Sequence, residues 1–283
     1  MISTNELLGL EGKTVVVTGA GGVICSRIAE GLCKVGMNVM LLDIDETRAI
    51  ETATKLKEKY PEQIIEGLFA NVLDKRSLES AKKRILSFVD AIDYIINGAG
   101  GNSPKATTQA EQIIQGETDD LSTFFDLEMD GFDHVFNLNF KGTLLPTMVF
   151  GKEMIERGFG NVLNISSMNA FRPLTKIPAY SAAKSSINNF TQWLAVHFAK
   201  TGIRVNAIAP GFFVTNQNRF LLFDEKGNST PRGQKIIDNT PMGRYGEVEE
   251  LVGTTIYLMS NMSKFVTGIV VPIDGGFSAY SGV

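Results

Sequence analysis

The chain contains few of the residues that form disulfides or bind metal ions. Its 283 residues include only two cysteines, two histidines and one tryptophan. Cys25 and Cys33 fall on one expected helix, which separates their Cα atoms by about 12 Å, too far for a disulfide. His134 and His197 are far apart in the sequence and lie near no cysteine. We therefore expect a cytoplasmic protein with reduced thiols and without a bound metal.

The sequence also lacks an excess of charge of one sign and any long apolar run. It has 27 Lys and Arg and 31 Asp and Glu, a net charge of −4. A nucleic-acid-binding protein would normally carry a basic stripe, and a protein that binds membrane surfaces a polybasic cluster. No stretch approaches the roughly 18 apolar residues of a membrane span, and residues 1–13 show no signal-peptide pattern. We expect no nucleic-acid partner and no membrane contact.

Short apolar segments alternate with amphipathic helical patterns from one end of the sequence to the other. The expected strands are residues 14–17, 39–42, 64–69, 94–96, 161–165, 204–208 and 269–273. Fully apolar strands separated by helices predict a parallel sheet covered on both faces. The fold class is therefore α/β: one Rossmann-type domain over residues 1–283, with a doubly wound sheet of about seven parallel strands. Two long polar segments, about 101–131 and 212–246, interrupt the alternation and are expected to be substrate loops.

Three glycine-containing turns follow strands, at the sheet edge where ligands bind in such folds. Residues 18–22 lie between the first strand and the first helix, where backbone amides can approach a pyrophosphate. Residues 97–100 and 210–211 supply the other two turns. Asp43 follows the second expected strand and can bind the adenine ribose hydroxyls, the alternative being a helix cap before Glu46. No Lys or Arg adjoins Asp43, which favours NAD over NADP.

Tyr180 and Lys184 share a helix face, and Ser167 follows the fifth strand. A tyrosine titrates near pH 10, so acid–base work near neutrality requires a stabilised phenolate. An adjacent ammonium and a bound nicotinamide ring would lower the pKa of Tyr180. Ser167 can donate to a carbonyl oxygen on which charge develops. A Tyr–Lys pair at this spacing is usually a solvated helix face, but its position after Ser167 and beside three glycine turns indicates catalysis.

These segments resemble the short-chain dehydrogenase/reductase family over nearly the whole sequence. The matching segments are residues 18–22, 97–100, 165–167, 180–184 and 210–211, together with Asn139. The resemblance implies that Tyr180 is the acid–base, that Lys184 lowers its pKa and binds the nicotinamide ribose, and that Ser167 orients the carbonyl. It also implies a water on Asn139, a carboxamide contact from Thr215, and a homotetramer. The implied NAD-binding residues are Thr18, Gly19, Gly21, Gly22, Val23, Ile24, Asp43, Asn71, Val72, Asn97, Gly98, Ala99, Gly100, Tyr180, Lys184, Pro210, Gly211, Phe213 and Thr215.

The sequence differs from the family pattern at three positions. Val23 and Cys25 stand where the family has glycines, and Asn71 stands where it commonly has an aspartate that contacts the adenine. Because valine rarely adopts a positive φ, we expect Gly21 and Gly22 to carry the unusual turn geometry. Cys25 is small enough to keep the helix close to the strand. We expect the pyrophosphate contact to change while cofactor binding persists.

The expected substrate side is rich in amides and cations. Its candidate residues are Asn102, Lys105, Asn169, Arg172, Gln217 and Arg219. Amides bind hydroxyls and arginine binds carboxylates in bidentate fashion, so this set suits a sugar acid. The alternative for each residue is an ordinary exposed loop position. Three functions remain open: reduction of a keto sugar acid, oxidation of gluconate or a deoxygluconate, and non-catalytic sensing of NAD.

Overall fold

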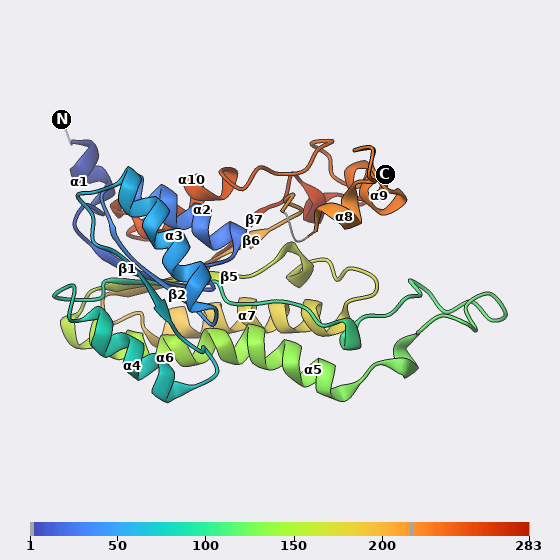
Figure 1. Cartoon of the computed structure of the whole chain (residues 1–283), viewed down its shortest axis with the longest axis horizontal. Helices are drawn as coiled ribbons and strands as arrows, with labels where there is room; N and C mark the ends of the chain where they lie inside the picture. The colour runs from blue at the N-terminus through green and yellow to red at the C-terminus, as the bar shows by residue number, and fades with distance from the viewer. Residues whose placement is uncertain (1–2, 216–217, 283) are drawn as a thin grey trace.

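A single sheet of seven parallel strands organises the computed structural model, which describes residues 3–215 and 218–282 (Figure 1). The strand order is β3-β2-β1-β4-β5-β6-β7. The strands are β1 (Thr14–Thr18), β2 (Asn38–Asp43), β3 (Ile65–Phe69), β4 (Tyr94–Asn97), β5 (Gly160–Ile165), β6 (Ile203–Pro210) and β7 (Val270–Ile273). The predicted doubly wound parallel sheet is confirmed, with each strand within a few residues of its expected position.

Helices cover both faces of the sheet. One face packs against α2 (Val23–Lys34), α3 (Glu46–Lys59) and α10 (Glu250–Met259), and the other against α4 (Lys75–Ile85), α6 (Gly142–Arg157) and α7 (Pro178–His197). Figure 1 shows these two layers above and below the strands. The remaining helices are α1 (Thr4–Leu8), α5 (Met129–Phe136), α8 (Arg219–Leu222) and α9 (Pro231–Asp238). Among the described helices, none is long and apolar enough to cross a membrane.

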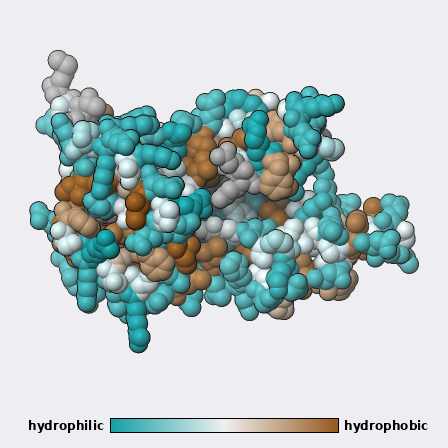
Figure 2. All heavy atoms as spheres, in the orientation of Figure 1, coloured by the Kyte–Doolittle hydropathy of each residue, from teal (hydrophilic) through white to brown (hydrophobic). Residues whose placement is uncertain are grey.

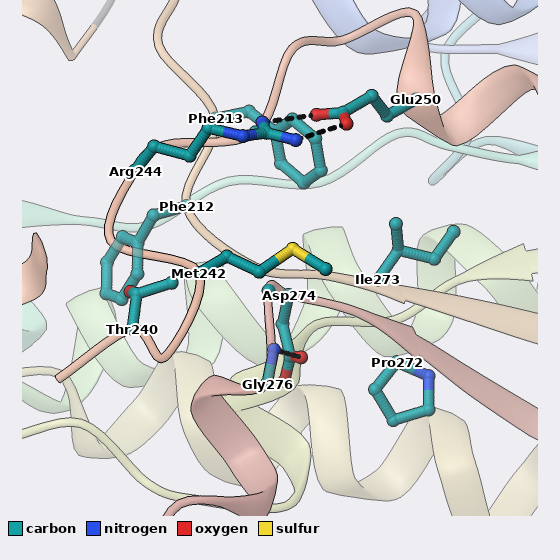
Figure 3. A pocket seen from close by; sticks show the side chains of 12 residues that line it. Phe212, Phe213, Thr240, Met242, Arg244, Glu250, Pro272, Ile273, Asp274 and Gly276 are labelled. Carbon is teal, nitrogen blue, oxygen red and sulfur yellow. Dashed lines mark hydrogen bonds and ion pairs between the residues drawn. The ribbon is translucent and has the colours of Figure 1, made fainter.

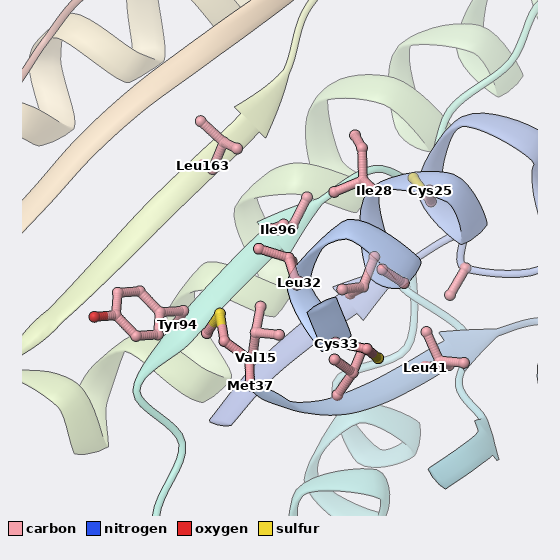
Figure 4. Close-up of a cluster of buried hydrophobic side chains, with 14 of the residues drawn as sticks. Val15, Cys25, Ile28, Leu32, Cys33, Met37, Leu41, Tyr94, Ile96 and Leu163 are labelled. Atoms are coloured by element: carbon pink, nitrogen blue, oxygen red, sulfur yellow. The ribbon is translucent and has the colours of Figure 1, made fainter. Parts of the chain in front are cut away.

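The core is divided by the sheet because successive side chains of a strand point to opposite faces. In β1, Val15 and Val17 belong to the cluster under α2, whereas Val16 belongs to the cluster over α6 and α7. Figure 4 shows Ile28 and Leu32 of α2 lying over β1 and β4. Burial on both faces explains why the strands read as continuous apolar runs.

The two long polar segments extend from the carboxyl edge of the sheet. Residues 101–131 form an arm that projects from the body (Figure 1), and residues 212–246 contain the short helices α8 and α9. Figure 2 shows the arm as mainly hydrophilic with interspersed apolar side chains, and Ile113 and Phe125 are among its exposed apolar residues. An ion pair between Glu111 of the arm and Lys235 of α9 links the two segments.

Candidate active site

A cleft of about 810 Å³ lies at the carboxyl ends of the strands. It runs from the turn after β1, past the ends of β2 and β4, to Tyr180 and the segment after β6. Of the expected cofactor residues, the cleft is lined by Gly19, Gly22, Val23, Ile24, Asp43, Asn71, Val72, Gly98, Ala99, Gly100, Tyr180, Gly211, Phe213 and Thr215. The strand order reverses between β1 and β4, and a crevice at such a switch point is where dinucleotides bind.

A smaller cavity of about 400 Å³ lies against the other side of the Phe212–Phe213 segment. Figure 3 shows its labelled side chains: the Arg244–Glu250 ion pair on one side, Asp274 and Gly276 on the other, and Met242 between them. Of the predicted site residues that the structure describes, only Phe213 lines this cavity. The predicted cofactor residues, with Tyr180 among them, therefore favour the larger cleft as the candidate site.

Gly19 allows the turn after β1 to pack closely against the turn after β4. Gly19 has a φ of +66°, and a Cβ there would lie 2.9 Å from the Ala99 Cα. Gly22 has a φ of −81°, and Gly21 is not in the left-handed region. The expectation that Gly21 and Gly22 carry the unusual geometry was wrong. The turn reverses one residue after β1, where it meets the turn after β4, so Val23 can begin α2 with ordinary backbone angles.

Cys25 packs beneath the cleft, where the family has a glycine. A Cβ on Gly98 would overlap the Cys25 Sγ, so α2 is held against the turn after β4. Burial raises the pKa of the Cys25 thiol to about 12. Cys25 is therefore a small uncharged packing residue, which agrees with the prediction that it keeps the helix close to the sheet.

The adenosine end of the cleft contains a carboxylate and a cation that both hold the backbone of Gly21. The Asp43 carboxylate accepts from the backbone N–H of Gly21 (2.9 Å) and of Asp45 (3.0 Å). Asp45, not Asp43, caps α3. The Arg48 guanidinium donates to the Gly21 carbonyl at 2.9 Å and lines the cleft. The sequence prediction missed Arg48 because it lies in the first turn of the next helix and not beside Asp43.

Several expected cofactor residues support the cleft from behind. The Thr18 hydroxyl accepts from the backbone N–H of Gly98 (3.1 Å) and Ala99 (3.3 Å), which fixes the second glycine turn. Asn97 is buried and donates to the side chains of Thr147 and Asn164. Asn71 accepts from the Leu73 N–H with its side-chain oxygen, which leaves its amide N–H groups as donors to the cleft. These residues shape the backbone that the ligand would contact.

Ser167 and Tyr180 come together as the sequence predicted, since Ser167 follows β5 and Tyr180 lies in the first turn of α7. Burial raises the pKa of Tyr180, and a hydrogen bond with Ser167 acts in the opposite direction. The expected lowering by Lys184 is not what the structure shows. The Lys184 ammonium lies 5.6 Å from the centroid of the Tyr180 ring and donates to the Ile165 carbonyl at 2.8 Å.

Lys184 is buried, and this burial lowers the pKa of its ammonium from 10.5 to about 8. Asn139 lies nearby in a π-helical turn, Asn137–Lys141, which ends α5. Its amide donates to the carbonyls of Gly101 (2.7 Å) and Val135 (2.8 Å). A Cβ on Gly100 would lie 2.7 Å from the Asn139 Oδ1 and 3.3 Å from the Lys184 Nζ. The two polar groups therefore border one small space beside Gly100.

The predicted substrate residues are separated by the structure. Asn102 lines the cleft, whereas Asn169 is buried and its side-chain oxygen has no hydrogen-bond partner among the described residues. Lys105 is tied to Glu128 (2.9 Å) and Asp130 (2.8 Å), so its charge is already paired. Gln217 lies outside the described residues.

The two predicted arginines make different contacts. The Arg172 Nε donates to the Ser278 carbonyl at 3.1 Å. The Arg219 guanidinium lies 5.1 Å from the centroid of the Phe223 ring. Within the described residues, Nε is the only side-chain nitrogen of Arg172 that makes a hydrogen bond. Its two terminal nitrogens, Nη1 and Nη2, are therefore available as a pair of donors.

His134, Leu138 and Asn218 are among the residues that line the cleft and that the prediction did not assign to it. Asn218 accepts from the Thr215 N–H and donates to the Phe213 carbonyl, both at 2.8 Å, and so holds the expected nicotinamide contact in place. His134 comes one helical turn before Leu138 on α5 and the following π-helical turn. The sequence gives no signal for the positions of these residues, because they depend on how the segments after β4 and β6 fold across the cleft. No cluster of metal-ligating side chains occurs in the described residues.

The parallel sheet, its switch-point cleft and the Ser–Tyr–Lys arrangement define a nicotinamide-dependent oxidoreductase. A family model described as Enoyl-(Acyl carrier protein) reductase matches residues 19–278. An uncharacterized oxidoreductase of Haemophilus influenzae is 52% identical over 277 residues, 97% of this chain and 96% of that protein. The protein belongs to the short-chain dehydrogenase/reductase family, and it is an NAD(P)-dependent enzyme that acts on a CH–OH group.

Two solved structures are similar over almost the whole length. One, from Haemophilus influenzae and provisionally described as a D-mannonate oxidoreductase with bound NAD, has a TM-score of 0.92 at 51% identity and covers 97% of this chain and 98% of that one. The other is a gluconate 5-dehydrogenase of Burkholderia cenocepacia in complex with NADP and tartrate. It has a TM-score of 0.84 at 26% identity and covers 98% of this chain and 100% of that one.

Proposed function

We propose that this enzyme interconverts D-fructuronate and D-mannonate with NAD as its cofactor. The observation that carries the proposal is the combination of Tyr180 with the polar side chains of Asn102, His134 and Asn218 in one cleft. Hydroxyl groups of a sugar acid would find donors and acceptors there. Residues 98–108, 166–184 and 209–219 also resemble the D-mannonate oxidoreductases of this family, also called fructuronate reductases. The similar structure with bound NAD supports the same substrate class.

In this proposal Tyr180 transfers the proton and Ser167 orients the reacting carbonyl. The chemistry that nicotinamide supplies when bound is a hydride for the ketone carbon, or a hydride acceptor in the reverse direction. Burial keeps Tyr180 protonated near neutral pH, so its hydroxyl can donate a proton to the carbonyl oxygen. Ser167 donates a hydrogen bond to the same oxygen and stabilises the charge that develops on it.

Lys184 and Asn139 return a proton to Tyr180 in the proposed mechanism. Burial lowers the pKa of the Lys184 ammonium to about 8, so it can lose and regain a proton near that pH. Asn139 borders the same small space beside Gly100, where a water held by its side-chain oxygen would lead away from Lys184. In this proposal Lys184 also binds the nicotinamide ribose, as the family resemblance implies.

Asp43 and Arg172 are the proposed recognition groups for the cofactor and the substrate carboxylate. The Asp43 carboxylate is fixed by two backbone N–H groups, so it can accept from the ribose hydroxyls without reorganising. Arg172 is favoured over Lys105 because Lys105 is already paired with two carboxylates. Held by the Ser278 carbonyl, Arg172 presents a fork that matches a carboxylate.

We also propose a cytoplasmic homotetramer that assembles through α6 and α7. Large apolar side chains are exposed on these helices, with Trp193 at 57%, Val196 at 79% and Met148 at 59% of their maximal accessible area. Contiguous exposed apolar patches mark interaction surfaces. Sedimentation velocity at micromolar concentration would show a single species of four times 30.9 kDa if the proposal holds, and a monomer would contradict it.

A panel of keto sugar acids tests the substrate assignment. Purified enzyme is mixed with NADH and either D-fructuronate or 5-keto-D-gluconate, and separately with NAD and 2-keto-3-deoxy-D-gluconate, whose C5 hydroxyl a 5-dehydrogenase would oxidise. The loss or gain of NADH absorbance is followed. We expect the highest kcat/KM with D-fructuronate. Good turnover of 5-keto-D-gluconate without turnover of fructuronate would favour the alternative, a gluconate dehydrogenase like the NADP-bound relative. Tight NADH binding without turnover of any compound would favour a regulatory NAD sensor.

A further inference from the structure

The backbone of Gly21 is held at both its N–H and its carbonyl by side chains of opposite charge. Its N–H donates to the Asp43 carboxylate at 2.9 Å, and its carbonyl accepts from the Arg48 guanidinium at 2.9 Å. A Cβ on Gly21 would lie 2.8 Å from the Arg48 Cβ and 3.1 Å from the Asp43 Oδ2, so both groups approach to contact distance. One anion and one cation therefore face the adenosine end of the cleft together.

Arg48 retains binding capacity beyond this one contact. A guanidinium carries five N–H donors in a fixed plane, and Arg48 lines the cleft with its bond to Gly21 made through Nη2. Within residues 3–215 and 218–282, Arg48 has no ion pair of the kind that ties Arg27, Arg157 and Arg244 to carboxylates. Its positive charge is therefore available to an anionic ligand.

We propose that Arg48 is a second specificity-determining residue of the cofactor site, a latent ligand for a ribose 2′-phosphate that the charge of Asp43 excludes. This inference rests on the proposed use of NAD. A 2′-phosphate adds negative charge at the ribose edge that Asp43 is expected to bind, and like charges held close together repel each other. Arginine binds phosphate oxygens in bidentate fashion, and an arginine near this edge is the feature that accommodates NADP.

The arrangement implies that the discrimination against NADP depends on one carboxylate. Asp43→Asn keeps the shape of the side chain and an oxygen acceptor for a backbone N–H, but removes the negative charge. Arg48 then becomes the dominant charge at that end of the cleft. We expect Asp43→Asn to raise the affinity for NADPH at least tenfold, with a smaller change in the affinity for NADH.

The test is a double-mutant cycle on dinucleotide binding. Dissociation constants for NADH and NADPH are measured by reduced-nicotinamide fluorescence for the wild type, Asp43→Asn, Arg48→Gln and the double variant. Lys55→Gln is the matched control, because Lys55 is an exposed cation on the same helix that does not line the cleft. Circular dichroism establishes that each variant is folded, and Asp43→Ser replaces Asp43→Asn if the latter is not.

The proposal predicts strong non-additivity in the cycle. Adding Arg48→Gln to Asp43→Asn should weaken NADPH binding by roughly 10- to 100-fold, the effect of losing a charge-assisted hydrogen bond. Arg48→Gln in the wild type should change NADPH binding far less, because Asp43 already excludes the phosphate. Lys55→Gln should leave both constants unchanged.

Equal NADPH affinity of Asp43→Asn and the double variant would overturn the role of Arg48. An Asp43→Asn variant that gains no affinity for NADPH would overturn it as well. Competition by adenosine 2′,5′-bisphosphate against NADH adds a readout confined to the adenosine end, and its inhibition constant should follow the NADPH constants. None of these measurements uses a sugar acid, so a failed substrate assignment leaves them interpretable.

Discussion

Replacing Lys184 by methionine should remove activity while making the cofactor-free fold at least as stable as the wild type at pH 7. Lys184 is 3% exposed, and burial lowers its pKa from 10.5 to about 8. Because a pKa lowered by one corresponds to about 1.4 kcal/mol, keeping the ammonium buried costs the folded state roughly 3 kcal/mol at pH 7. Methionine fills a similar volume without a charge.

The substitution also removes a hydrogen bond. The Ile165 carbonyl, which accepts from Lys184 at 2.8 Å, would lose its donor, at a cost of about 1–3 kcal/mol. The net effect at pH 7 is therefore between about 0 and 2 kcal/mol in favour of Lys184→Met. At pH values at which both states hold a neutral lysine, only the hydrogen-bond loss remains, and the wild type is the more stable protein.

The pH dependence provides the decisive readout. An unfolded lysine keeps its proton up to about pH 10.5, whereas Lys184 in the folded protein loses it near pH 8. Between these values the unfolded state binds more protons, so the wild type gains stability as the pH rises. Urea unfolding at pH 7, 8, 9 and 10 should show the free-energy difference between wild type and Lys184→Met shifting by roughly 2–3 kcal/mol in favour of the wild type.

Lys55→Met is the matched control for this measurement, because Lys55 is exposed on α3. Its free-energy difference from the wild type should stay constant over the same pH range. If the difference for Lys184→Met is equally constant, Lys184 is not a buried ammonium with a lowered pKa, and the reasoning fails.

Three further predictions concern pH, packing and substrate binding. The kcat/KM for ketone reduction should fall as the pH rises through about 8, as Lys184 loses its proton; a flat profile from pH 6 to 9 would exclude this role. Gly98→Ala should lower the free energy of unfolding by about 1–3 kcal/mol, since its Cβ would overlap the Cys25 Sγ; unchanged urea unfolding would show that the turn relaxes freely. Arg172→Gln should raise the KM for the sugar acid about tenfold with NADH affinity intact, and an unchanged KM would remove Arg172 from the substrate site.

The sequence was sufficient for the sheet and for the position of the predicted catalytic pair, Ser167 and Tyr180. Continuous apolar strands alternating with amphipathic helices permit few arrangements, and residues that follow parallel strands must meet at one edge. The position of Ser167 and Tyr180 could therefore be inferred without coordinates. The glycine turns followed from the same rule, although Gly19 and not its neighbours adopts the positive φ.

The contacts of long polar side chains could not be predicted in the same way. Lys105 looked available to a substrate, but α5 and the residue before it bring Asp130 and Glu128 within 3 Å of it. Arg48 was not considered because it does not adjoin Asp43 in the sequence, but the first turn of α3 places it on the Gly21 carbonyl. These outcomes depend on where a neighbouring helix begins and in which direction it faces, and the spacing of residues in the sequence records neither.

The role of Tyr180 as the group that transfers the proton accompanying hydride transfer is central to the proposed function. The most direct measurement compares Tyr180→Phe with the wild type in NADH-dependent reduction of the best keto sugar acid, alongside the dissociation constant for NADH. Phenylalanine keeps the ring and removes only the hydroxyl. We predict a loss of kcat of about 10²- to 10⁴-fold with NADH affinity within a factor of about three. Unchanged kcat in Tyr180→Phe would contradict this role.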